Sequence, residues 1–281
     1  MQKLKIGIVS RSFGDLTHAE TAKLMQDNSV TSTELCLHSA DTRLWAYNGR
    51  SDMSQLSDNA FADIVKTYRD AGVEVTSLGV FTDMINEDAG ELAKNLDHFE
   101  HHMRLASNNG IPYLPTEIGF RGDSRGILSH RYESDWNRLV ESLGDLCRRA
   151  DKYGVCLALE CCVLDIVPSA KRAADLRKQV GSSRLKFLLD PANLIANSSE
   201  EDMFKYLAKD IAYFHGKDRK VNDAYGRALG DGDIDWPLFL RLYHEQCEGL
   251  PFILEYVNID TFKEIMDRTW AFDEIARRGL S

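Results

Sequence analysis

Four side chains of the kind that bind metal ions each close a short apolar run. The runs read LALE, FLLD, YFH and FILE, and their last residues are Glu160, Asp190, His215 and Glu255. The intervals between them are 30, 25 and 40 residues, close to the roughly 30 residues of one strand and helix unit. If each run is a strand of one parallel barrel, the four side chains meet at the same rim.

The chemistry of these four residues indicates a metal site. A single carboxylate that ends a strand is more often a helix N-cap or a solvated loop residue. Three carboxylates and one imidazole together form a mixed oxygen and nitrogen donor set, which suits Mn²⁺, Mg²⁺ or Co²⁺ better than a thiolate-rich structural zinc site does. Without an ion, the packed carboxylates would raise one another's pKa and destabilise the fold. We therefore expect one divalent metal ion, with Mn²⁺ favoured and Mg²⁺, Co²⁺ or Zn²⁺ as alternatives.

The elements that position these residues follow a regular alternation of short β-branched runs and longer amphipathic stretches. This alternation predicts repeated strand and helix units. The eight expected strands are residues 4–10, 32–37, 73–81, 111–120, 155–161, 185–190, 211–215 and 251–256. Eight such units, in a length near ~250 residues, predict an α/β fold of the (β/α)₈ TIM barrel type, with residues 1–281 as a single domain. A doubly wound open sheet is the alternative, but GIVSRSFG after the first strand lacks the dinucleotide-binding glycine fingerprint.

Composition restricts the partners. The formal net charge of −10 disfavours nucleic acid, because the phosphate backbone would be repelled. No run approaches the 18 apolar residues of a membrane span, and the first residues pass into a strand pattern without a signal-peptide core. The six cysteines form no C-x-x-C pair and are read as reduced core thiols. We expect a cytoplasmic protein that binds neither nucleic acid nor a membrane.

A second group of metal-ligand residues lies on a helical pattern. His98, His101 and His102 fall mostly off the apolar stripe of residues 92–110. On the polar side of a surface helix, such a cluster is more often solvated than metal-binding. We therefore expect these histidines to face solvent and leave them out of the site.

Several motifs resemble a known family. LALE, LLDPANL, FHGKD, GDGDIDWPLFL and ILEY, in this order and at these spacings, resemble the xylose-isomerase-like TIM-barrel superfamily. More narrowly, they resemble its sugar isomerase and epimerase branch, with D-tagatose 3-epimerase, hydroxypyruvate isomerase and the inosose enzymes. The resemblance implies that Glu160, Asp190, His215 and Glu255 bind one divalent ion. Glu34 matches a strand-two glutamate common in that branch, and we assign it to substrate binding.

The chain also departs from that family pattern at positions that bind substrate. Enzymes of the tagatose type usually carry a histidine where this chain has Asn193, and an arginine where it has Val221. Lys217 and Arg219 are the nearer basic residues. We expect Lys217, Asn193 and Arg219 to bind a substrate with a different hydroxyl pattern, although Lys217 could instead pair with Asp218.

The residue types define a reaction. Removing a proton beside a carbonyl requires the developing enolate oxygen to be neutralised, and a metal ion does this as Lewis acid and template. Glu160 and Glu255 come from different sides of the predicted site, so we assign them as the acid and base pair. The sequence thus predicts a divalent-metal-dependent isomerase or epimerase that acts on a keto sugar or keto-polyol through a metal-stabilised enediolate. Arg121 and Arg125 are either a substrate clamp or solvated loop residues.

Other functions remain open. A lyase or dehydratase of the same superfamily, acting on a keto-inositol or a 3-keto-glycoside, would share the first proton transfer. An apurinic-site endonuclease is disfavoured, because Asn193 replaces an expected ligand and the net charge of −10 repels DNA. A sugar-binding barrel without catalysis gives no reason for four ligands.

The resemblance also suggests a homodimer or homotetramer. Trp45 and Tyr47 lie in the long loop after the second strand, where exposed aromatic residues often mark interfaces or lids.

Overall fold

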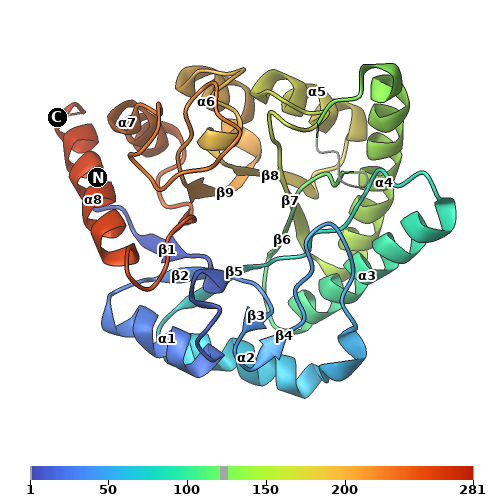
Figure 1. Ribbon diagram of the computed structural model, residues 1–281, viewed down its shortest axis with the longest axis horizontal. Helices are drawn as coiled ribbons and strands as arrows, with labels where there is room; N and C mark the ends of the chain where they lie inside the picture. Colours follow the sequence, from blue (N-terminus) through green and yellow to red (C-terminus); the bar gives the residue numbers. More distant parts are fainter. Residues whose placement is uncertain (1, 121–125, 281) are drawn as a thin grey trace.

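A computed structural model describes residues 2–120 and 126–280 of the chain. Eight parallel strands close into a barrel with the order β1-β10-β9-β8-β7-β6-β5-β2, and the helices surround it (Figure 1). The barrel strands are β1 (Ile6–Ile8), β2 (Ser32–Leu35), β5 (Glu74–Leu78), β6 (Tyr113–Thr116), β7 (Cys156–Glu160), β8 (Leu185–Leu189), β9 (Ile211–Gly216) and β10 (Phe252–Leu254). The predicted (β/α)₈ TIM barrel is confirmed.

Each barrel strand is followed by a helix. The helices are α1 (His18–Asp27), α2 (Asp58–Asp70), α3 (Ala89–Asn108), α4 (Tyr132–Tyr153), α5 (Ala170–Val180), α6 (Glu200–Leu207), α7 (Trp236–Gln246) and α8 (Phe262–Arg278). Their ends follow local rules: Thr17 and Glu20 form a reciprocal capping box at α1, and Gly154 ends α4 in the left-handed conformation at φ 70°. No helix in the described ranges is both long and apolar enough to cross a membrane.

Two details differ from the sequence expectation. Seven of the eight barrel strands are shorter than predicted. For example, only Ile6–Ile8 is paired where residues 4–10 were expected, because the flanking residues leave the sheet to enter loops. The exception is β9, which extends one residue further than predicted, to Gly216. A small antiparallel hairpin, β3 (His38–Ser39) and β4 (Thr42–Arg43), follows β2. It was not predicted, because two-residue strands leave no periodic signal.

The core has two layers. The larger lies between the barrel and the helices, while a small cluster fills the barrel interior. Its members Ala158, Leu188, Tyr213 and Ile253 each stand two residues before one of the four predicted ligands. Residues i and i+2 of a strand share a face, so this apolar layer is the floor on which the predicted site rests.

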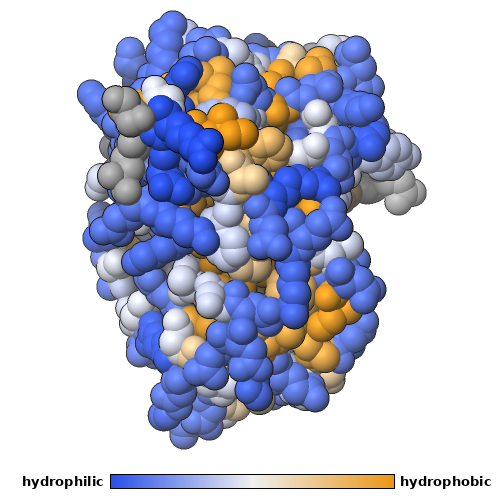
Figure 2. Space-filling model, turned by 90° about the vertical axis from the view of Figure 1, so that its left-hand side faces the viewer, coloured by the Kyte–Doolittle hydropathy of each residue, from blue (hydrophilic) through white to orange (hydrophobic). Residues whose placement is uncertain are grey.

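The face of the molecule beside α8 is mostly polar. Figure 2 views the molecule from the side of α8, where hydrophilic residues cover most of the face and hydrophobic residues form separate patches. The histidines of α3 do not all face solvent: His102 is buried at 3% exposure. The prediction of a solvated face is wrong for this residue, because the buried face of α3 also includes Asn95 and Leu105 and is wider than its apolar stripe.

Candidate metal centre

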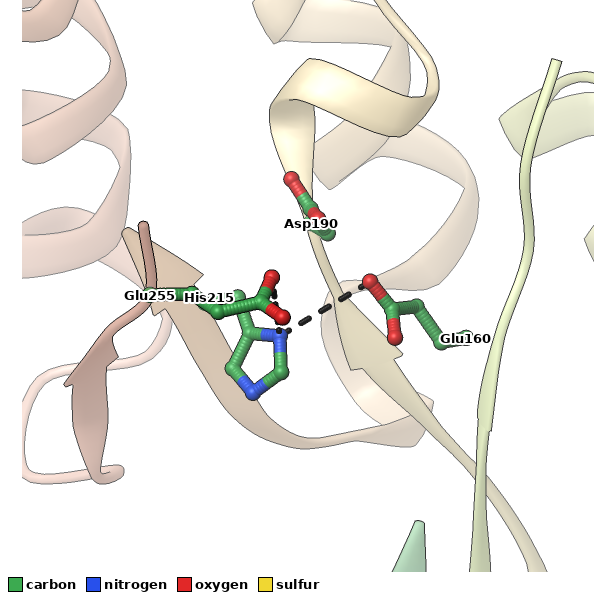
Figure 3. Close-up of side chains that lie close together, drawn as sticks. All are labelled: Glu160, Asp190, His215 and Glu255. Atoms are coloured by element: carbon green, nitrogen blue, oxygen red, sulfur yellow. Dashed lines mark ion pairs between the residues drawn. The ribbon is translucent and has the colours of Figure 1, made fainter. Parts of the chain in front are cut away.

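The structure brings the four predicted ligands together at the C-terminal ends of β7 to β10. One ligand atom from each of Glu160, Asp190, His215 and Glu255 lies within 4.8 Å of the others, and all four residues are buried. Figure 3 shows the side chains converging from successive strands. No other group of this kind occurs in residues 2–120 and 126–280.

The two carboxylate oxygens of Asp190 have different partners. Oδ1 accepts a hydrogen bond of 2.9 Å from the backbone N–H of Ala192, so Asp190 is the N-cap of the short turn Pro191–Asn193. Oδ2 points at the cluster, where the ammonium Nζ of Lys217 lies 2.6 Å away. The N-cap and the metal-ligand interpretations of this aspartate are therefore compatible.

Lys217 provides the positive charge in the centre of the cluster. Its Nζ also lies 2.7 Å from Glu255 Oε2 and 3.3 Å from Glu160 Oε1. Burial alone would lower the pKa of Lys217, but Asp190, Glu255 and Glu160 outweigh burial and raise this pKa well above its usual range. Lys217 thus contacts three carboxylates and does not pair with Asp218.

Glu34 orients His215 from below. Glu34 Oε2 lies 3.0 Å from His215 Nε2 and accepts a hydrogen bond of 2.6 Å from the Tyr213 hydroxyl. His215 Nδ1 is left facing the cluster, 3.7 Å from Glu160 Oε1. Metal-binding histidines commonly bond a carboxylate through the second ring nitrogen in this way. Glu34 also lines the cavity, so its assignment to substrate binding stays a prediction.

Arg11 is a site residue that the sequence did not reveal. It follows β1, and its guanidinium forms an ion pair with Glu255. Burial would lower the pKa of Arg11, but Glu255 and other acidic neighbours more than offset burial and raise it. The contact joins residues 244 positions apart. The surrounding sequence, SRSFG, contains no pattern that predicts this contact for Arg11.

Asn193 and Arg219 form a chain of hydrogen bonds that ends on Glu160. Asn193 Nδ2 donates to Glu160 Oε1 at 2.7 Å, and Arg219 Nη2 donates to Asn193 Oδ1 at 3.2 Å. Arg219 also donates to the carbonyls of Ala192 at 2.9 Å and Ala224 at 2.7 Å. Both side chains line the cavity. Their contacts orient Glu160, and substrate binding by either stays a prediction.

The carboxylates of the cluster do not titrate alike. Burial would raise the pKa of Glu160, but Lys217 and His215 hold it well below its usual range. Glu255 is affected in the same way, with Lys217 and Arg11 outweighing burial to lower its pKa. For Asp190, burial dominates and, with Glu160 close by, raises the pKa to about 8. Neighbouring carboxylates that share a proton separate in this manner.

The donor set fits a divalent metal ion. His215 Nδ1 is buried and makes no hydrogen bond within the described residues. Burial would lower the pKa of His215, but Glu34 and Glu160 outweigh burial and raise it, so the ring binds a cation through Nδ1 after it loses its proton. The Lys217 ammonium already shows that the three carboxylates accept one positive charge among them. Oxygen and imidazole donors in this ratio suit Mn²⁺, Mg²⁺, Co²⁺ or Zn²⁺.

A cavity of about 270 Å³ opens above the cluster. Glu160, His215, Lys217 and Glu255 form its charged end, and Trp45, Tyr47, Phe81, Glu117 and Tyr256 are among the residues of its other walls. Predicted site residues Asn193, Arg219 and Glu34 also reach it, whereas Arg121 and Arg125 lie outside the described residues.

The loop after β9 is fixed by Asp218. Its buried carboxylate accepts hydrogen bonds from the backbone N–H groups of Arg219 at 2.8 Å, Gly230 at 3.0 Å and Ile234 at 3.3 Å, and from Trp236 Nε1 at 2.8 Å. A Cβ on Gly232 would come 2.1 Å from Asp218 Oδ1, so only glycine lets the backbone wrap this closely. Of these two adjacent residues, Lys217 contacts the carboxylate cluster and Asp218 stabilises the loop.

The fold and this cluster define a barrel with a candidate metal site, and sequence comparison gives its family. Residues 27–275 match the family described as xylose isomerase-like TIM barrel, and the chain belongs to that family. The resemblance inferred from the motifs is confirmed at this level. No curated protein sequence gives a significant match.

Solved structures show the same fold at low sequence identity. A D-psicose 3-epimerase from Clostridium cellulolyticum H10, solved with D-tagatose, is 14% identical with a TM-score of 0.74, covering 98% of this chain and 99% of its own. The 3-keto-D-glucoside 4-epimerase YcjR from E. coli is 12% identical with a TM-score of 0.76, covering 96% and 100%. The IolI protein with a bound zinc atom is 16% identical with a TM-score of 0.73, covering 98% and 99%.

Proposed function

We propose that this protein is a divalent-metal-dependent isomerase or epimerase of a keto sugar or keto-polyol. The observation that carries the proposal is the placement of two glutamates in one cluster. Glu160 on β7 and Glu255 after β10 are separated by the two intervening strands, and both line the same cavity. Two carboxylates that approach a substrate from different sides are what proton transfer on two faces requires.

The protonation states support this role. The pKa values of Glu160 and Glu255 are both lowered by their cationic neighbours, so both are carboxylates at neutral pH and able to accept a proton. A divalent ion held by Glu160, Asp190, His215 and Glu255 would supply Lewis acidity to the substrate carbonyl and a neighbouring hydroxyl. Lys217 lines the same cavity, so its ammonium would add a second positive charge to the region where the substrate oxygen gains charge.

The proton then has two fates. One glutamate takes the hydrogen from the carbon beside the carbonyl, which leaves the substrate as its enolate. If the other glutamate returns a proton to the opposite face, the carbon is epimerised. If the proton instead goes to the former carbonyl carbon, and the hydroxyl proton of the deprotonated carbon moves to the former carbonyl oxygen, the carbonyl moves to the neighbouring carbon and the sugar is isomerised.

The test is hydrogen exchange in heavy water. D-Fructose, D-tagatose, D-psicose and a keto-inositol are incubated with the metal-loaded enzyme, and deuterium beside the carbonyl is followed by NMR. Glu160→Gln and Glu255→Gln are expected to lower turnover by on the order of 10²-fold or more, and Glu201→Gln on the exposed side of α6 is the matched control. Near wild-type rates in both variants with metal retained would refute the two-carboxylate mechanism.

The same experiment distinguishes an isomerase or epimerase from a lyase or dehydratase. A lyase or dehydratase would also exchange hydrogen, but its product would lack the eliminated group. Product analysis by mass spectrometry identifies this loss directly.

A further inference from the structure

We propose that the substrate carries a second sugar unit, which binds on two tyrosines at the mouth of the cavity. These residues, Tyr47 and Tyr256, are called the tyrosine rim here. The proposal rests on the proposed function and specifies its substrate class: a glycoside or disaccharide with its keto unit at the carboxylate cluster.

The first observation is the distribution of exposed apolar side chains. Among the described residues, eight large hydrophobic side chains are exposed. Seven of them lie in loops that follow barrel strands, and the eighth, Ile275, lies on α8. Tyr47 is 41% exposed and Tyr256 is 52% exposed, and both line the cavity. Tyr225, which is 77% exposed, directly follows the lining residue Ala224.

Tyr256 is held in place at a conformational cost. It directly follows Glu255 and has a φ of 56°, in the left-handed region that a tyrosine rarely adopts. The backbone of Gly226 lies against its ring, because a Cβ at that position would be 2.6 Å from Tyr256 Cζ. Lys217 Nζ is 5.4 Å from the ring centroid. The ring is therefore fixed beside the charged end of the cavity while half of its surface remains open.

Tyr47 is fixed in a different way. Its hydroxyl donates to Glu117 Oε2 at 2.5 Å, and its ring stacks on Trp45 with centroids 6.0 Å apart and an angle of 23°. Phe81 lies 6.2 Å away on the same wall. These contacts hold the orientation of a ring that is still exposed at the mouth.

Fixed and accessible aromatic rings beside a polar pocket match the chemistry of a sugar. A pyranose presents apolar C–H faces that stack on aromatic rings and hydroxyl groups that bond the polar residues between them. The cavity of about 270 Å³ is at the small end of ligand pockets, so a substrate of two sugar units would fill it with one unit and extend the other to the rim. Ring walls that are already ordered lose little entropy on binding.

The experiment compares one-unit and two-unit ketoses. Isothermal titration calorimetry with the metal-loaded protein measures the affinities for D-fructose and for the disaccharides isomaltulose and turanose, which each add a glucosyl unit to fructose. We expect at least one disaccharide to bind about tenfold more tightly than D-fructose, the scale of one aromatic contact. Tyr256→Ala and Tyr47→Ala should each reduce that ratio toward one, whereas Ile275→Ala, an equally exposed residue on α8, should leave it unchanged.

Several results would overturn the rim. Equal affinities for the three sugars, no binding of any of them, or an unchanged ratio in both tyrosine variants would each do so. A homodimer in light scattering that Tyr256→Ala converts to a monomer would also overturn it, because the rim would then be a subunit interface. A retained disaccharide preference without metal-dependent hydrogen exchange would instead refute the proposed function and leave the rim standing.

Discussion

Two regions of this molecule concentrate side chains that could bind a metal ion. They differ in where the side chains come from, in their charge and in their hydrogen bonds. At the barrel mouth, Glu160, Asp190, His215 and Glu255 come from four strands and surround a buried ammonium group. On α3, His98, His101 and His102 are neighbours on one helix, with ring centroids of His98 and His102 4.5 Å apart.

The difference lies in charge and direction. At the mouth, opposite charges compensate one another, so Glu160 and Lys217 stay ionised although they are buried. On α3, burial lowers the pKa of His98 to about 4 and that of His102 to about 3, so these rings are neutral. Moreover, His102 Nδ1 is 2.8 Å from the carbonyl of His98 and is bonded within its own helix. Closeness in sequence alone therefore does not identify a candidate metal site, whereas ionisable groups that converge from separate strands do.

The largest expected effect is loss of the metal. Asp190→Ala and His215→Ala each remove one donor from a site of four, and we expect neither variant to retain stoichiometric metal after dialysis. Metal content per chain by mass spectrometry is the measurement. Full metal content in both variants would contradict the assignment of Asp190 and His215 as metal ligands.

The paired control comes from α3. His98→Ala and His101→Ala should bind metal like the wild type, because these rings are not part of the cluster. Chelation of the wild type should also lower its melting temperature, since a ligand bound only by the folded state stabilises it. If His98→Ala or His101→Ala lost the metal while Asp190→Ala and His215→Ala kept it, the metal site would lie on α3 and not at the barrel mouth.

A smaller effect is expected from the residue that orients the histidine. Glu34→Gln keeps the size of the side chain but removes the charge that faces His215 Nε2, and such changes typically weaken metal binding about 10–100-fold. Competition with a fluorescent chelator measures the affinity. Tyr213→Phe, which removes only the hydrogen bond of 2.6 Å to Glu34, should have a weaker effect in the same direction. An affinity equal to wild type in Glu34→Gln would restrict Glu34 to the predicted substrate role.

The smallest effect concerns stability and pH. The pKa of His102 is lowered to about 3 in the folded protein, against about 6.5 in an unfolded chain. Between these values the unfolded state binds more protons, so the stability from His102 is complete above about pH 6.5 and decreases as the pH falls, by at most ~1.4 kcal/mol per pH unit. Urea unfolding at pH 7 and pH 5 should show this slope, and His102→Asn should reduce it. An identical slope in the variant would mean that His102 does not carry the effect.

The sequence allowed the fold to be predicted because its signals are local. Each strand is a short apolar run, and each ligand residue ends its run, so the barrel brings Glu160, Asp190, His215 and Glu255 to one rim without further information. Three features had no local signal. Arg11 reaches Glu255 across 244 positions, and Lys217 turns toward the carboxylates and not toward Asp218. His102 is buried on a face of α3 that is wider than the apolar stripe of the helix.

Asp218 has a practical consequence for protein engineering. Its carboxylate anchors both ends of the loop that follows β9, at Arg219 and at Gly230, Ile234 and Trp236. The intervening residues 220–229 contribute none of these donors. A library that randomises exposed positions such as Val221, Asn222 and Tyr225, while Asp218 and Gly232 are kept, would therefore vary the loop around the cavity-lining residue Ala224 at little cost in folding. It is the natural starting point for directed evolution of ligand preference.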